Sequence, residues 1–154
     1  MLKKIIPNGN YKKFLETQIS GLTGHIENAG FPFDRVSWKT CDYMSNNENP
    51  GWWIYEQTAY WLDGYTRLGI LLDDKKIINE ASEIIYGAIS RADEDGFIGP
   101  KFLKPMVEDW YGRWAYVVFF RACMALYEYN SDKNILDAMI KHYKNDKAPY
   151  TQHG

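Results

Sequence analysis

The sequence predicts an all-α protein built from stacked helical hairpins. Apolar residues recur at the three- and four-residue spacing of helices in several segments, and no segment shows the alternation expected of a strand. A long helix, a tight turn and a shorter helix also follow one another twice along the chain. With 154 residues the chain is long enough for one hydrophobic core, so we assign residues 1–154 to a single helical domain.

The first predicted helix runs from Asn10 to about Asn28, and a long loop follows it. Its apolar residues at helical spacing are Phe14, Leu15, Ile19, Leu22 and Ile26. Gly30 is expected to stop the helix. Residues 31–50 contain Pro32, Pro50 and a polar run, which predict a loop. The aromatic residues of this loop argue against disorder, and they are Phe31, Phe33, Trp38 and Tyr43.

Four further helices form two pairs. The second helix spans roughly Trp53 to Leu72, and its apolar stripe consists of Ile54, Trp61, Tyr65, Leu68 and Leu72. Asp73 or Asp74 is expected to cap a third helix, whose predicted buried face consists of Ile77, Ile78, Ala81, Ile84, Ile85 and Ala88. After a turn at residues 93–100, a fourth helix runs from about Trp110 to Tyr129 and a fifth from about Lys133 to Lys144.

The two helix pairs resemble each other in sequence. The segment "LGILLDDKKIINEA" (68–81) resembles "LYEYNSDKNILDAM" (126–139) at an offset of 58 residues, the distance from Asp74 to Asp132. The same offset places Trp52 on Trp110. Repeated helical hairpins are typical of solenoids and of α/α toroids, in which each hairpin buries its apolar face against its neighbours.

Composition argues against several classes of partner. The chain has a net charge of −2 and no extended basic cluster, which argues against a nucleic-acid partner. No apolar run approaches the ~20 residues of a membrane span, and the apolar run in the start "MLKKIIPNGN" is too short for a signal peptide. We therefore expect a soluble protein, cytoplasmic by default, although a domain cut from a secreted protein would look the same. Cys41 and Cys123 lack metal-ligand spacing, so we expect free thiols and no metal.

The second helix carries an unusual polar face opposite its apolar stripe. At about 100° per residue, Trp52, Glu56, Asp63 and Arg67 fall on that face, flanked by Gln57, Tyr60 and Gly64. The fourth helix repeats the arrangement with Trp110, Arg113 and Arg121. An ordinary solvated face with an Asp–Arg or Glu–Arg pair would also account for these charges. Aromatic rings beside carboxylate, amide and guanidinium groups nevertheless suit sugars, because a sugar's CH face stacks on the ring while its hydroxyls form hydrogen bonds.

These observations predict a substrate-binding groove between the hairpins. Its predicted residues are Trp52, Glu56, Gln57, Asp63, Trp110 and Arg113. We expect an ion pair of Asp63 with Arg113 or Arg121 to hold the shape of the groove. A carbohydrate is the expected ligand.

Several longer segments resemble a known enzyme family. The segments "GWWIYEQTAYWLDGYTRLGILLDD", "EDGFIGP" and "GRWAYVVFFRACMALYEYNSDKNILDAMIKHY" are similar to the amino-terminal part of glycoside hydrolase family 127, the β-L-arabinofuranosidases and their relatives. The likeness extends from about Thr17 to the end of the chain. The resemblance implies that the chain forms part of an (α/α)6 catalytic barrel; in the family, β-domains follow this barrel. It also implies activity on non-reducing-end L-arabinofuranosides or related plant glycans.

The chain departs from that family at the catalytic machinery. The family's arabinofuranosidases use a zinc-held cysteine nucleophile and a glutamate acid/base, but no CxC, CC or Cys–Glu cluster surrounds Cys41 or Cys123. We therefore assign no catalytic or zinc-binding residue and expect no cofactor in this chain. A barrel of six hairpins also needs more than the five helices predicted here. We expect a fragment or truncated form whose exposed hairpin edges favour self-association.

Three interpretations of function follow from these features. The first is an amino-terminal portion of a glycosidase barrel that contributes sugar-pocket residues without a complete catalytic set. The second is a non-catalytic helical-repeat module that binds a glycan or a protein. The third makes Glu56 and Asp63 an acid/base pair, which we disfavour because two carboxylates on one helix flank a glycosidic bond awkwardly.

Overall fold

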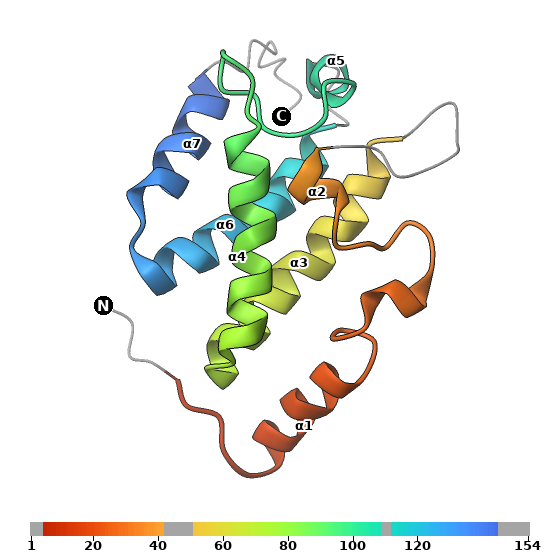
Figure 1. The fold of residues 1–154 in the computed structure, drawn as a ribbon, viewed down its shortest axis with the longest axis vertical. Coiled ribbons are helices and arrows are strands. Elements are labelled where there is room, and N and C mark those ends of the chain that lie inside the picture. Colours follow the sequence, from red (N-terminus) through yellow and green to blue (C-terminus); the bar gives the residue numbers. More distant parts are fainter. Residues whose placement is uncertain (1–4, 42–50, 109–111, 145–154) are drawn as a thin grey trace, which may run out of the picture.

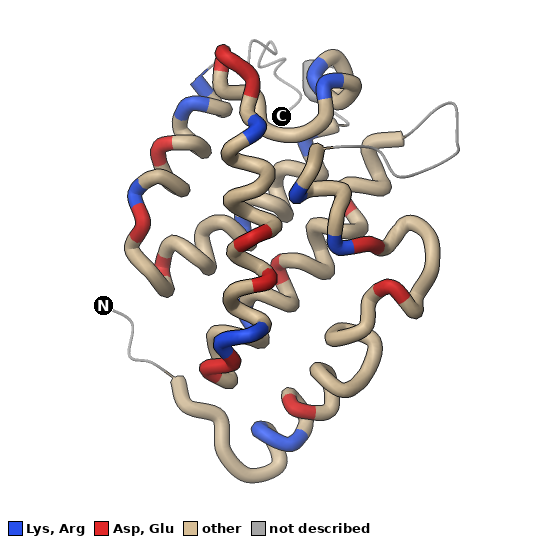
Figure 2. Tube along the Cα trace, viewed as in Figure 1, with Lys and Arg blue, Asp and Glu red and all other residues tan. Residues whose placement is uncertain are grey.

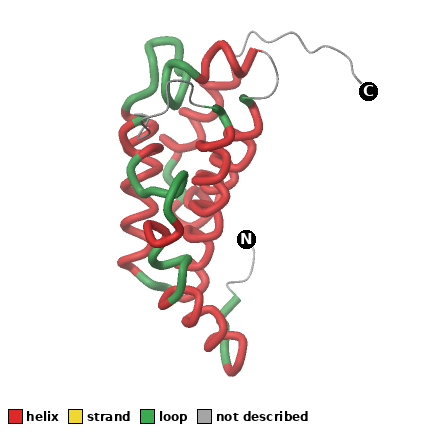
Figure 3. Tube along the Cα trace, turned by 90° about the vertical axis from the view of Figure 1, so that its right-hand side faces the viewer, coloured by secondary structure: helices red, strands yellow, loops and turns green. Residues whose placement is uncertain are grey.

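The computed structural model describes residues 5–41, 51–108 and 112–144, and every regular element in these ranges is a helix (Figures 1 and 3). In chain order the elements are α1 (Gly9–Ser20), the 3₁₀ helix η1 (Ile26–Ala29), α2 (Ser37–Thr40), α3 (Trp53–Leu72), α4 (Lys75–Ser90), α5 (Leu103–Glu108), α6 (Arg113–Asn130) and α7 (Lys133–Lys144). The prediction of an all-α fold is confirmed.

The two predicted helix pairs are hairpins with matching turns. Asp73 ends α3 in the left-handed conformation with φ 56°, and Ser131 ends α6 in the same conformation with φ 58°. Asp74 then caps α4 by accepting hydrogen bonds from the amides of Lys76 and Ile77. Asp132 accepts a comparable hydrogen bond from the Asn134 amide, at 3.0 Å. The 58-residue repeat in the sequence therefore corresponds to two helical hairpins with similar turns.

The four long helices pack in two layers. In Figure 1, α3 and α6 both begin near α2 and run side by side in the same direction, and they pack extensively against each other. α4 packs on α3 and crosses in front of the α3–α6 pair, while α7 packs on α6. One side of the α3–α6 pair is therefore covered by α4 and α7.

Trp38 of α2 lies at the centre of the core. Its ring stacks on Phe119 of α6, with ring centroids 4.0 Å apart, and meets Tyr55 and Tyr116 edge-on. Its indole N–H donates a hydrogen bond of 3.0 Å to the carbonyl of Tyr55. The segment 31–50 was predicted to be a long loop, but its described part contains the short helix α2, which places Trp38 in the core. Tyr43 and Pro50 lie outside the described residues.

The first helix is shorter than predicted. It ends at Ser20, not near Asn28, because the chain turns at Gly21, whose amide donates to the Thr17 carbonyl at 2.9 Å. The remaining predicted residues continue through a turn into η1. Leu15 and Ile26 are buried as predicted and Ile19 is half-buried, but Phe14 and Leu22 are exposed. The break in the helix rotates the later residues away from the stripe that a continuous helix would bury.

Arg35 fastens this amino-terminal segment to the first hairpin. Its guanidinium forms ion pairs with Glu27 at 3.2 Å and Glu80 at 2.9 Å, and it lies over the rings of Trp61 and Tyr65. The Trp61 indole N–H also donates to the Thr23 carbonyl at 2.9 Å. Residues 23–35 therefore lie against the α3–α4 hairpin on its side away from α6 (Figure 1).

Charge is mixed over the described chain. Figure 2 shows lysine and arginine interspersed with aspartate and glutamate, without an extended segment of one sign in the drawn ranges. None of the described helices is both long enough and apolar enough to span a bilayer.

The short helix α5 was not predicted from sequence. Its six residues, with Pro105 in the first turn, show no apolar periodicity.

Candidate functional site

Among the residues that the structure describes, no other helix covers one side of α3. Trp53 and Tyr60 are exposed there, Glu56 and Gln57 are half-buried between them, and Arg67 is exposed one turn beyond Asp63. These positions are separated by three or four residues or by multiples of a turn, so they share one helical face. The opposite side of α3 is buried by α4, α6 and the amino-terminal segment.

α6 extends this uncovered side. Trp114, Val117 and Arg121 are exposed at spacings of three and four residues. Arg121 pairs with Asp63 across the two helices, and the helices run in the same direction (Figure 1). Residues seven positions earlier on each helix, Glu56 and Trp114, therefore lie two turns closer to the helix starts on the same side. We name this surface the α3–α6 face and define it by Trp53, Glu56, Gln57, Tyr60, Trp114 and Arg121.

Asp63 joins the two helices at the border of this face. Its side chain is only 8% exposed, and its carboxylate pairs with Arg67 at 2.7 Å and with Arg121 at 2.9 Å. Arg67 also donates to the backbone carbonyl of Arg121 at 3.3 Å. Of the two predicted pairings across the groove, the Asp63–Arg121 pair is formed. Because each carboxylate oxygen of Asp63 contacts a guanidinium, Asp63 is suited to hold the two helices together.

Glu56 differs from Asp63 in its surroundings. Its carboxylate has no hydrogen bond or ion pair with the residues that the structure describes, and partial burial raises its pKa above the usual value of 4.5. A carboxylate that has lost water without gaining a partner favours a ligand that donates hydrogen bonds. The neighbouring Gln57 amide likewise has no partner among the described residues and could both donate to and accept from such a ligand.

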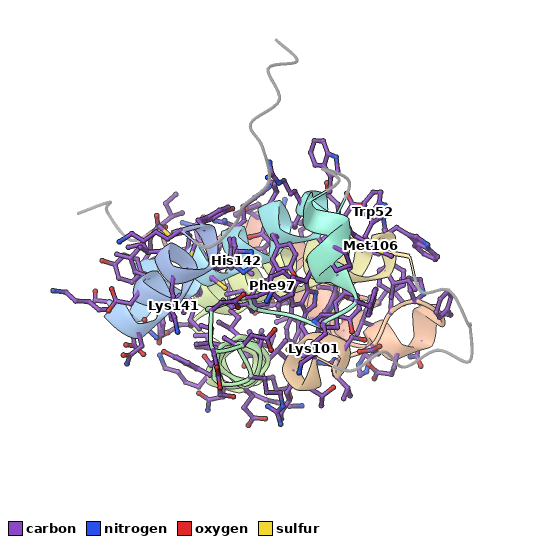
Figure 4. All side chains as sticks on the ribbon, turned by 90° about the horizontal axis from the view of Figure 1, so that it is seen from above. Trp52, Phe97, Lys101, Met106, Lys141 and His142 are labelled. Carbon is purple, nitrogen blue, oxygen red and sulfur yellow. The ribbon has the colours of Figure 1, made fainter. Side chains whose placement is uncertain are left out.

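Of the other predicted site residues, Trp52 and Arg113 lie at the starts of α3 and α6, and Trp110 lies outside the described ranges. Trp52 immediately precedes α3, is half-buried and packs against the core. In Figure 4 it lies toward the end of the molecule that also carries Met106 of α5. Arg113 is the first residue of α6 and is half-buried, and Trp110 lies outside the described residues. The structure thus groups Glu56 and Gln57 beside Asp63, without Trp52.

Sequence reasoning missed two aromatic residues of the face. The apolar pattern marks Trp53 only as the start of a helix and gives no signal for Trp114. Two signals point to them in retrospect. Trp53, Gln57 and Tyr60 follow helical spacing, and the 58-residue offset places Glu56 on Trp114.

His142 is a buried polar residue outside the α3–α6 face, at the end of the molecule shown in Figure 4. Its Nδ1 accepts a hydrogen bond of 3.0 Å from the Ile98 amide, and its ring packs against Phe97 and Tyr116. Nearby on α7, the Lys141 ammonium donates to the Glu94 carbonyl at 3.0 Å. These contacts hold the segment after α4 against α7, which is a structural role that the apolar pattern of α7 did not indicate.

The described residues contain no group of three or more histidine, cysteine, aspartate or glutamate side chains arranged to hold a metal ion. Cys41 and Cys123 do not form a disulfide; Cys41 is half-buried and Cys123 is fully buried. Burial raises the pKa of the Cys123 thiol far above its usual value, which keeps it protonated and unreactive.

Comparison of the chain with protein-family models, with curated proteins and with solved structures found no match in any of the three.

Proposed function

We propose that the α3–α6 face binds carbohydrate. On this proposal the chain is an amino-terminal portion of a glycoside hydrolase that acts on non-reducing-end L-arabinofuranosides or related plant glycans. The observation that carries the proposal is that the α3–α6 face combines three exposed aromatic rings, Trp53, Tyr60 and Trp114, with the half-buried Glu56, which has no partner among the described residues.

The chemistry of this face suits a sugar. An exposed indole or phenol ring presents a flat apolar surface on which the CH face of a sugar can stack. The Glu56 carboxylate can accept hydroxyl protons, and the Gln57 amide can both donate and accept. Arg121, which is held by Asp63, keeps further guanidinium N–H donors at the edge of the face.

The resemblance of residues 51–74 and 112–143 to glycoside hydrolase family 127 supports the choice of an arabinofuranoside. The all-helical hairpins of the described chain are compatible with part of an α/α barrel. The proposal gives this chain sugar-pocket residues without a complete catalytic set, because Asp63 is engaged by two arginines and no cysteine lies on the face.

Calorimetric titration of the chain with an L-arabinofuranosyl oligosaccharide tests this proposal. We expect binding that Trp114→Ala weakens roughly three- to tenfold, the worth of one aromatic contact. Glu56→Gln should also weaken binding, because the amide accepts hydrogen bonds less strongly than the carboxylate. Tyr11→Ala is the matched control, since Tyr11 is an exposed aromatic residue of α1 away from the face.

Two outcomes of the titration would contradict the proposal. Absence of binding, or equal weakening by Tyr11→Ala and Trp114→Ala, would contradict a sugar site on this face. We further expect no turnover of a para-nitrophenyl arabinofuranoside by this chain. Turnover that Glu56→Gln abolishes would instead favour a catalytic role for Glu56.

A further inference from the structure

Asp63 meets two cations with a single negative charge. Its side chain is 8% exposed and pairs with Arg67 and Arg121, whose side chains are 45% and 57% exposed. An arginine side chain is always protonated in proteins, and one carboxylate balances only one guanidinium. One positive charge of this cluster is therefore left unbalanced at the border of the α3–α6 face. We name Arg67 and Arg121 the arginine pair.

Both members of the arginine pair keep unused hydrogen-bond donors. Arg67 uses Nε for the Asp63 carboxylate and Nη2 for the Arg121 carbonyl, while its Nη1 has no partner among the described residues. Arg121 meets Asp63 through Nη2, and its Nε and Nη1 likewise have no partner in the described ranges. A guanidinium carries five N–H donors in one plane, so the contacts with Asp63 do not saturate either arginine.

The other carboxylates of α3 and α6 do not neutralise the arginine pair. Glu56 precedes Asp63 by seven residues on α3, and Glu128 follows Arg121 by seven residues on α6. Seven residues correspond to about 10 Å along a helix, and surface charges that far apart are largely screened at physiological ionic strength. Neither glutamate forms an ion pair with a described residue, so the positive charge remains available.

The arginine pair lies beside an aromatic ring of the α3–α6 face. Tyr60, Gly64 and Arg67 follow one another at spacings of four and three residues, so they form one stripe on α3. Arg67 reaches back one turn to Asp63, which places its guanidinium over the turn that separates it from Tyr60. Gly64 in that turn is exposed, and a Cβ added to it would meet nothing within 4 Å. No side chain of this stripe therefore stands between the Tyr60 ring and the Arg67 guanidinium.

This arrangement suits a sugar that carries a carboxylate. A sugar unit stacked on Tyr60 brings its substituents toward the arginine pair, and a neutral hydroxyl there would leave the positive charge unbalanced. A carboxylate supplies one negative charge and two oxygens, whose spacing matches two parallel N–H groups of a guanidinium. Uronic acids present such a carboxylate in place of the primary alcohol of a neutral sugar.

We propose that the α3–α6 face selects acidic glycans, and that Arg67 and Arg121 bind the carboxylate of a uronic acid unit next to the sugar stacked on the aromatic rings. This inference rests on the carbohydrate site proposed above and adds the charge of its ligand. Asp63 holds the two guanidinium groups beside each other before the ligand arrives, which reduces the entropy lost on binding.

Calorimetric titration with two matched ligands tests this inference. The first ligand is an L-arabinofuranosyl oligosaccharide with one uronic acid unit. The second is the same oligosaccharide after reduction of its carboxyl group to a primary alcohol. We expect the acidic ligand to bind roughly five- to tenfold more tightly at low salt, because its carboxylate forms charge-assisted hydrogen bonds. Added salt should narrow the difference, since exposed charges are screened.

Variants of one arginine show whether this pair causes the preference. Arg67→Gln should reduce the preference for the acidic ligand to about twofold or less and leave the affinity for the reduced ligand nearly unchanged. Arg67→Lys keeps the charge without the planar donors and should retain an intermediate preference. Arg91→Gln is the matched control, since Arg91 is an exposed arginine at the end of α4 that donates to backbone carbonyls.

The outcomes separate this inference from the carbohydrate site itself. Equal binding of the two ligands by the wild type, or equal loss of the preference in Arg67→Gln and Arg91→Gln, would overturn the inference and leave the carbohydrate site standing. Absence of binding of either ligand would contradict the carbohydrate site and the inference with it. Circular dichroism shows whether each variant keeps its helices, and Arg121→Gln provides the second variant if Arg67→Gln fails to fold.

Discussion

Asp63 and Arg121 occupy equivalent positions of the two hairpins, separated by the 58-residue offset, and their side chains form an ion pair of 2.9 Å. A pair between equivalent positions aligns α3 and α6 turn by turn. That alignment places Glu56 and Trp114 on the same side of the molecule, two turns away. The Asp63–Arg121 pair therefore links the repeat to the geometry of the α3–α6 face.

Replacement of Asp63 by alanine should lower the free energy of unfolding by about 1–3 kcal/mol. The Asp63 carboxylate is buried and satisfies two guanidinium groups, and its removal leaves both arginines without this partner. Urea melts of the wild type and the variant measure the change. Asp137→Ala, at an exposed position of α7, should stay within about 0.5 kcal/mol of the wild type. A shift within error for Asp63→Ala would make the pair an ordinary surface contact.

Replacement of Trp38 by alanine should cost about 3–5 kcal/mol, because it opens a large cavity between α2, α3 and α6. Trp38→Phe should cost less, since a ring can still stack on Phe119 while the hydrogen bond to the Tyr55 carbonyl is lost. Denaturant unfolding of both variants gives the two values. If Trp38→Ala unfolds at the wild-type midpoint, the segment around α2 does not belong to the cooperative core.

The difference in stability between a Glu56→Gln variant and the wild type should depend on pH in a defined direction. Burial raises the pKa of Glu56 above 4.5 in the folded state, so folding becomes less favourable as pH rises through the interval between the unfolded and folded pKa values. Above that interval the ionised carboxylate disfavours folding, and Glu56→Gln should melt at a higher temperature than the wild type. Below the interval both forms are neutral, and the difference should vanish.

Glu27 provides a control of opposite sign for this pH series. A backbone hydrogen bond and the hydrogen bond from Arg35 lower the pKa of Glu27. Its contribution to stability is therefore present above the unfolded pKa and is lost as pH falls through the folded pKa. Glu27→Gln should melt below the wild type at neutral pH. The same sign of change for both variants at neutral pH would exclude this account of Glu56.

The two thiols should react at different rates in the folded protein. Cys41 is half-buried, whereas Cys123 is fully buried with a raised pKa, so a thiol reagent should modify Cys41 first. Under denaturing, non-reducing conditions two thiols should be counted. The Cys41→Ser variant should show almost no reaction until it is unfolded. A count of zero in the denatured wild type would reveal a disulfide and contradict the structure.

Local pattern alone was sufficient for several elements. All six residues predicted to form the buried face of α4 are buried, because a helix packed on one side must repeat its apolar residues with the helical period. The bounds of α3 and α7 also match the prediction. Asp74 was one of two expected caps, and its side chain reaches amides only two and three residues ahead. These features depend on neighbours in sequence, so sequence was enough to predict them.

The candidate site was only partly predictable. Helical periodicity correctly placed Glu56 and Gln57 near Asp63, because these residues share a few turns of one helix. It did not identify Trp53 as an exposed residue of that face, nor Trp52 as a residue packed against the core. The centre of an exposed face depends on where α4 and α6 cover α3. That arrangement is a property of the packed molecule.

The sequence by itself thus determined the helical class, the repeat and the bounds of α3 and α7, since each follows from residues within a few turns of one another. Only the tertiary structure decided the position of Trp38, which enters the core from a segment without apolar periodicity and stacks on a residue 81 positions away, from 38 to 119. Arg35 likewise joins η1 to α4 through contacts that no local pattern encodes. Such contacts depend on how separate helices meet in space, and the free energy that selects them comes from burial shared among distant residues.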